Sequence, residues 1–172
     1  QSNLELDMET NDDSDLSEFD TFSYTGDTSY IKYKSKTTSS LLQDEFSISI
    51  LVKPSKIKLN ENKDYDDLPI FSIPGYNIGL FYNSFRRFFC QVYDVEKTPY
   101  SITTDIVGEK WSHLCMTYSN ENILKFYLNG NLVDTVEMKE EILQLSSDEV
   151  FVGASNGEKT NKEFFYGLIS NI

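Results

Sequence analysis

The side chains that could carry out chemistry are few in this sequence of 172 residues, and the single histidine, His113, is the first of them. One histidine excludes a multi-histidine zinc site, and any Ser-His-Asp triad would have to use it. Trp111, His113, Cys115 and Thr117 alternate along one run, so a strand would place them on one face. We interpret His113 as a structural residue of that face.

Paired carboxylates, which would support glycoside hydrolysis, do not occur at a productive spacing in the strands expected from Phe22 onward. Both acids must reach one cleft, and within a strand this requires an even separation. In those strands Asp134 and Glu137 are the nearest pair of acids, but they are three positions apart and would point to opposite faces. We therefore expect that the protein is not an enzyme.

Arg86 and Arg87 are the sharpest candidates for ligand contact, because they lie beside aromatic residues in an acidic chain. Guanidinium groups bind carboxylates and sulfates through paired hydrogen bonds, and aromatic rings attract cations and stack on sugar faces. Tyr76 and Asn77, in an expected loop, could line the same side. The alternative is an exposed turn whose arginines pair with acids of the same chain.

Oxygen ligands for a metal ion are offered by acids in two expected loops. Asp64, Asp66 and Asp67 form one cluster, and Asp27 lies in an earlier loop. Calcium is the ion that prefers such ligands, although no spacing matches an EF-hand loop. The alternative is that these are solvated loop acids, so calcium is the one cofactor that the sequence leaves open.

Short strands separated by turns are the elements that must position these residues. The composition is 14% aromatic, which favours pleated sheets, and Asn129-Gly130 between two strand-forming runs predicts a tight type I′ hairpin. The expected strands, beginning at Phe22, include residues 30–34, 46–53, 68–73, 77–82, 88–93, 100–104, 111–118, 123–128, 132–137, 149–152 and 164–172. Residues 137–146 are expected to form a loop or one short helix. This pattern predicts an all-β fold, an antiparallel jelly-roll β-sandwich.

The charge is unevenly distributed along the chain. The net charge is −13, and residues 1–20 contain eight acids and no bases. We expect residues 1–20 to be an acidic and largely flexible segment, in which alternation at Leu4, Leu6 and Met8 predicts one peripheral strand. Residues 21–172 are expected to form the sandwich. The acidic balance argues against nucleic acid and anionic membranes as partners.

The two cysteines, Cys90 and Cys115, fall in expected strands and form no CxxC motif. We favour two buried free thiols; the alternative is a disulfide between neighbouring strands, which would imply an oxidising compartment. No run of about 18 apolar residues is present, so no direct membrane insertion is expected. There is also no basic and apolar leader of the kind that directs secretion.

Six short motifs from residue 22 to the end resemble, in the correct order, those of the laminin-G-like, concanavalin-A-like jelly-roll family. They are Phe22-x-x-x-Gly26-Asp27-x-Ser29-Tyr30-Ile31, Phe46-Ser47-Ile48-Ser49-x-x-Val52-Lys53-Pro54, Trp111-x-His113-Leu114-x-x-Thr117-Tyr118, Phe126-Tyr127-Leu128-Asn129-Gly130-x-Leu132-Val133, Val152-Gly153 and Phe165-x-Gly167-Leu168-Ile169. Ser170-Asn171 stands where the family usually has Asp-Glu. The family also continues beyond that point, so we expect a segment of a larger polypeptide.

The resemblance implies a non-catalytic recognition or adhesion module that binds glycan or protein, within a larger secreted or surface protein and beside its neighbouring domains. The extracellular space or the cell surface is therefore the expected location. The alternative function is a structural domain that docks within its own polypeptide or complex. A glycoside hydrolase is the third possibility. Related glucanases carry the strand motif Glu-x-Asp-x-x-Glu or Glu-x-Asp-x-Glu; the first does not occur, and the second occurs only at residues 5–9, ahead of the part that resembles the family. If the Trp111 ring lies in the core, Trp111→Ala should destabilise the fold by roughly 3–5 kcal/mol.

Overall fold

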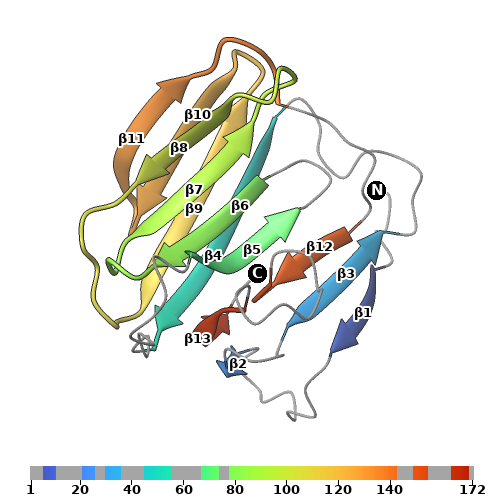
Figure 1. Ribbon diagram of the computed structural model, residues 1–172, viewed down its shortest axis with the longest axis vertical. Coiled ribbons are helices and arrows are strands. Elements are labelled where there is room, and N and C mark those ends of the chain that lie inside the picture. Colours follow the sequence, from blue (N-terminus) through green and yellow to red (C-terminus); the bar gives the residue numbers. More distant parts are fainter. Residues whose placement is uncertain are drawn as a thin grey trace.

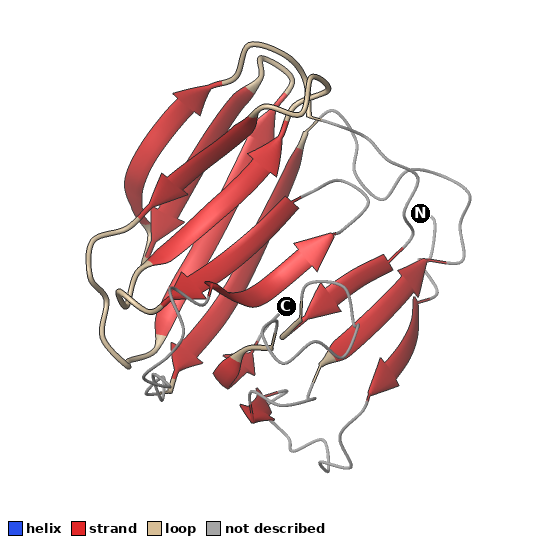
Figure 2. Cartoon of the chain, viewed as in Figure 1, coloured by secondary structure: helices blue, strands red, loops and turns tan. Residues whose placement is uncertain are grey.

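The protein is described here by a computed structural model, which covers residues 6–10, 21–25, 30–35, 45–55, 67–73, 78–142, 149–154 and 164–170. These residues form strands and connecting loops, with no helix among them (Figure 2). The strands are β1 (Leu6–Thr10), β2 (Thr21–Thr25), β3 (Ile31–Ser35), β4 (Phe46–Pro54), β5 (Asp67–Ile73), β6 (Ile78–Asn83), β7 (Phe88–Tyr93), β8 (Pro99–Thr103), β9 (Ser112–Ser119), β10 (Ile123–Leu128), β11 (Asn131–Glu137), β12 (Glu149–Val152) and β13 (Tyr166–Ser170) (Figure 1).

The strands form two antiparallel sheets. One sheet has the order β1-β3-β12-β5-β6-β7-β8, and the other has the order β11-β10-β9-β4-β13-β2. The shared hydrophobic core takes buried side chains from both sheets, so the sheets pack face to face. The predicted jelly-roll sandwich is confirmed, and so is the peripheral strand near the N-terminus, because β1 lies at the edge of the seven-stranded sheet.

Strict alternation along β9 separates an inner face from an outer face. Ser112, Leu114, Met116 and Tyr118 are buried, and the intervening residues face outward. The face that carries Trp111 and His113 is therefore the outer one. The Trp111 side chain is 42% exposed, so the condition for a large loss of stability on its removal is not met.

The Asn129-Gly130 turn ties the β10–β11 hairpin to the start of β9. Both residues have positive φ, 52° and 80°, as a type I′ turn requires. The Asn129 N–H donates to the His113 carbonyl, and the Asn129 Oδ1 atom accepts from the His113 N–H, each at 2.8 Å. His113 Nε2 is also hydrogen-bonded to Ser49 Oγ at 2.7 Å. These contacts agree with a structural role for His113.

The segment after β11 contains no helix within the described residues. Glu137 ends the strand, Met138 is buried against the core, and Ile142 forms an isolated bridge with Asp94. The segment up to residue 142 is therefore a loop, one of the two expected conformations. Residues 143–148 lie outside the described part of the chain.

Cys90 and Cys115 are free thiols in different sheets, as the favoured interpretation held, but only Cys90 is buried as that interpretation also expected. Cys90 lies on β7 and is fully buried, whereas Cys115 is half-buried on the outer face of β9. Burial raises the pKa of the Cys90 thiol from 9.0 to about 12, and it also raises the pKa of the Cys115 thiol.

The buried Cys90 thiol predicts a loss of stability in alkali. Because the folded state raises the pKa of this thiol from 9.0 to about 12, the unfolded state loses the proton first as the pH rises. The contribution of the protonated Cys90 thiol to stability is therefore intact below pH 9.0 and is lost as the pH rises towards 12. In this range the free energy of unfolding should fall by roughly 1.4 kcal/mol per pH unit.

Urea unfolding at a series of alkaline pH values measures this slope. Cys90→Ala is the control: it should lower stability at every pH through the cavity that it leaves, and it should flatten the slope. Equal slopes for the two proteins would contradict the prediction.

Candidate binding surfaces

Three connections meet at one end of the sandwich, seen at the lower left of Figure 1. We define the loop end as residues 83–87, 104–111 and 129–132. The Val107 N–H donates to the Arg86 carbonyl at 2.7 Å, which joins the first two segments. Asn129 joins the third segment to β9 through its two hydrogen bonds to His113. Antiparallel pairing therefore brings residues far apart in the sequence onto one surface.

The turn that carries the two arginines is held by Asn83. The Asn83 Oδ1 atom accepts hydrogen bonds from the backbone N–H groups of Phe85 and Arg87, at 3.1 and 3.2 Å. The backbone of Asn83 also bonds to Arg86 and Arg87, at 2.9 and 3.0 Å. Arg86 has a φ of 60°, a left-handed conformation that favours glycine or asparagine. The sequence therefore keeps an arginine at a strained position.

Apolar side chains are exposed beside these arginines. Within the described residues, four of the six exposed large hydrophobic side chains belong to the loop end. They are Phe85 (54% exposed), Ile106 (59%), Trp111 (42%) and Leu132 (53%). Gathered exposed apolar groups of this kind commonly mark an interaction surface.

The charges at the loop end are available to a ligand. Arg86 and Arg87 are the only arginines of the sequence, and both are exposed. Within the described residues neither guanidinium forms an ion pair, so the alternative of pairing with the chain's own acids finds no support there. The hydroxyl of Tyr82, on β6 just before this turn, is buried and has no hydrogen-bond partner among the described residues. Burial raises the pKa of Tyr82, Glu109 raises it further, and Arg86 lowers it.

The strain at Arg86 gives a testable prediction. Arg86→Asn should raise the free energy of unfolding by roughly 0.5 kcal/mol, because asparagine tolerates the left-handed region better than arginine does. Arg87→Asn is the matched control, because Arg87 has no positive φ, and it should give no gain. Urea denaturation measures both variants. A loss of stability confined to Arg86→Asn would show that its guanidinium supports the fold.

The other predicted ligand residues are only partly described. Tyr76, Asn77, Asp27, Asp64 and Asp66 lie outside the described residues, so their roles stay predictions.

Asp67 is exposed at the start of β5, and its backbone pairs with that of Asn83 beside the arginine turn. Among the described residues no three His, Cys, Asp or Glu side chains gather in a way that could hold a metal ion. Calcium binding therefore also stays a prediction.

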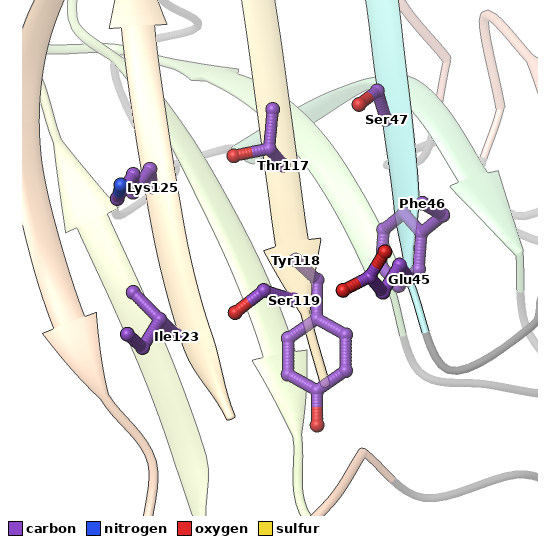
Figure 3. Close-up of a pocket in the computed structure, with 8 residues that line it drawn as sticks. All are labelled: Glu45, Phe46, Ser47, Thr117, Tyr118, Ser119, Ile123 and Lys125. Atoms are coloured by element: carbon purple, nitrogen blue, oxygen red, sulfur yellow. The ribbon is translucent and has the colours of Figure 1, made fainter. Parts of the chain in front are cut away.

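A shallow hollow of about 340 Å³ lies on the outer face of the six-stranded sheet, and Figure 3 shows its lining. Eight residues of β4, β9 and β10 and their ends form it: Glu45, Phe46, Ser47, Thr117, Tyr118, Ser119, Ile123 and Lys125. Sequence analysis missed this feature. Alternation at positions 45/47, 117/119 and 123/125 could have assigned each pair to one face, but it could not show that the three strands are neighbours.

The two antiparallel sheets and their connections define a jelly-roll sandwich. Residues 25–172 match the family model Laminin_G_3, described as the concanavalin A-like lectin/glucanases superfamily. The chain belongs to this family, and the resemblance seen in its motifs is confirmed. A search of curated protein sequences finds no match.

Solved structures with the same fold include parts of bacterial toxin domains. The botulinum neurotoxin serotype D ligand-binding domain, in complex with N-acetylneuraminic acid, has a TM-score of 0.74 and 15% identity over 98% of this chain and 42% of that chain. The receptor-binding domain of botulinum neurotoxin D has a TM-score of 0.73 and 16% identity over 98% of this chain and 43% of that chain. The type G receptor-binding domain has a TM-score of 0.65 and 18% identity over 96% of this chain and 41% of that chain. The chain thus spans less than half of these structures. Within the described residues no helix is long and apolar enough to cross a membrane.

Proposed function

We propose that this domain is a non-catalytic recognition module that binds an anionic ligand, glycan or protein, through Arg86 and Arg87 at the loop end. One observation carries the proposal: both arginines of an acidic chain are held on a fixed, exposed turn, and neither forms an ion pair in the described part. Guanidinium groups placed in this way suit carboxylates and sulfates. The related toxin domain in complex with N-acetylneuraminic acid, which is an acidic sugar, supports this class of ligand.

The absence of catalytic machinery among the described residues supports a binding role. Ser49 and His113 form a serine–histidine pair at 2.7 Å, but no carboxylate is hydrogen-bonded to His113 within the described part. A triad would need that third group. Asp134 and Glu137 are exposed on β11, three positions apart, so this pair lacks the even spacing that glycoside hydrolysis on one strand face would need.

We further propose that the domain belongs to a larger secreted or surface protein and lies beside neighbouring domains. The chain spans between 41% and 43% of three similar structures. Two of these structures are named as receptor-binding domains, which supports a place in a secreted or surface protein.

A glycan array that contains sialylated, sulfated and neutral glycans tests the proposal, together with a double variant, Arg86→Asn with Arg87→Gln. We expect acidic glycans to bind the wild type and to lose at least about tenfold in affinity for the double variant. Lys139→Gln, an exposed lysine outside the loop end, is the control. Unchanged binding by the double variant, with a melting temperature no lower than that of the wild type, would contradict the proposal.

Docking within a larger polypeptide is the second candidate function, and the four exposed apolar side chains of the loop end favour it. Hydrogen exchange of residues 104–111 can be compared between this domain alone and the full polypeptide. Protection in the full polypeptide without added ligand would indicate docking. Equal exchange in both would leave the loop end free for an external ligand.

A further inference from the structure

We infer that the hollow on β4, β9 and β10 is a second binding site, which takes one sugar unit that carries a carboxylate. This inference does not depend on the proposed role of the loop end. The hollow lies at the far end of the same sheet: β9 begins beside Trp111 at the loop end and finishes at Ser119 in the hollow. A ligand bound in the hollow therefore leaves the loop end open, and a ligand at the loop end leaves the hollow open.

The strand register arranges the lining in two rows across three strands. Ser47, Thr117 and Lys125 lie directly opposite one another in the first row. In the second row Ser119 is opposite Ile123, and Glu45 occupies the corresponding position just before β4. Neighbouring strands are about 4.8 Å apart, so the two rows cover about 10 Å across the sheet. This width is comparable with that of a sugar ring and its substituents.

The two charged groups stand on opposite sides of the hollow. Figure 3 shows Lys125 on β10 to one side and Glu45 next to β4 on the other, with β9 between them. Within the described residues neither group forms an ion pair. One cation and one anion remain available, separated by a floor of small polar side chains.

Hydroxyl groups form that floor, and one of them lacks a partner. Thr117 and Ser119 lie between the charges, and Ser47 lies on the β4 side. The Ser119 Oγ atom is buried without a hydrogen-bond partner among the described residues. A buried polar atom left in this state destabilises a protein by about 1–3 kcal/mol. Because this atom is closed to solvent, a ligand hydroxyl would remove the penalty once the Ser119 side chain turns its Oγ atom towards the hollow.

These groups select the chemistry of the ligand. The Lys125 ammonium suits a carboxylate, while the Glu45 carboxylate and the three hydroxyls suit the hydroxyl groups of a sugar. Ile123 offers an apolar contact for the C–H face of a ring. Glu45 would repel a second negative charge, so the arrangement favours a ligand with one carboxylate over a polyanion. The hollow is small for a ligand pocket, which matches a single sugar unit.

An NMR titration tests this inference with matched sugars. Methyl glucuronide and N-acetylneuraminic acid are the acidic probes, and methyl glucoside, which lacks the carboxylate, is the neutral control. We expect the acidic probes to shift the amide signals of residues 45–47, 117–119 and 123–125. Lys125→Gln should weaken acidic-sugar binding by about tenfold or more, and Thr117→Val should weaken it several-fold.

Lys53→Gln is the matched control variant, because Lys53 lies on β4 of the same sheet at the opposite end from the hollow. The inference is overturned if neither acidic probe shifts these signals, if the glucoside binds as tightly as the glucuronide, or if Lys53→Gln weakens binding as much as Lys125→Gln does. The Arg86 and Arg87 double variant should bind these probes in the hollow normally. Its behaviour therefore separates a failure here from a failure of the loop-end proposal.

Discussion

Replacing Gly167 with alanine is expected to lower the free energy of unfolding by roughly 3–5 kcal/mol. Gly167 is buried in β13, and its φ of 152° lies in a region that side chains rarely adopt. An added Cβ atom would lie 2.4 Å from the carbonyl oxygen of Lys53 and 2.9 Å from the Phe165 ring. A backbone oxygen in a central strand cannot move away as a flexible side chain can, so both the clash and the strain remain.

The position of β13 makes this effect global. β13 pairs with β4 on one side and with β2 on the other, so its displacement would open the six-stranded sheet. Gly108→Ala is the matched control: its Cβ atom would meet nothing within 4 Å, and its effect should be near zero. Urea denaturation of both variants measures the difference. A Gly167→Ala protein as stable as Gly108→Ala would show that β13 is not packed as described.

Phe126→Ala should destabilise the fold by about 3–5 kcal/mol, whereas Trp111→Ala should lower stability by about 1 kcal/mol or less. Phe126 is fully buried on β10, and its removal leaves a cavity in the core. Trp111 is 42% exposed on the outer side, so much of its ring already contacts water and its removal leaves no closed cavity in the core. Removal of the tryptophan ring, although it is the larger of the two, is thus expected to destabilise the fold less.

Thermal and urea unfolding of the two variants, measured side by side, check this ranking. A Trp111→Ala loss as large as that of Phe126→Ala would place the tryptophan ring in the core. A near-neutral Trp111→Ala that also weakens ligand binding would add Trp111 to the recognition surface of the loop end.

Trp111 also shows how much of the fold could be predicted from the sequence. Alternation along residues 111–118 predicted the strand and grouped Trp111 with His113 and Cys115. It could not show which face lies inside, because both faces of β9 carry large side chains and a period of two treats them equally. Asn129-Gly130 was more informative, since its turn type depends on two adjacent residues and on no distant contact.

The candidate sites show a similar limit. The Arg86-Arg87 turn was predicted because its chemistry lies in adjacent residues. Ile106 and Leu132 reach the same surface only through the strand order, and the same is true of Ser47, Thr117 and Lys125 in the hollow. Strand order depends on which sheet edges meet in three dimensions, and local patterns do not encode it.

The two free thiols have a consequence for how this domain can be handled and delivered. Cys90 and Cys115 are the only cysteines of the sequence, and they lie in separate sheets without a bridge. The sandwich therefore owes its stability to packing and hydrogen bonds and not to a covalent cross-link that a reductant could open. The domain should therefore keep the same fold in reducing and in oxidising compartments, in the presence of glutathione or in its absence.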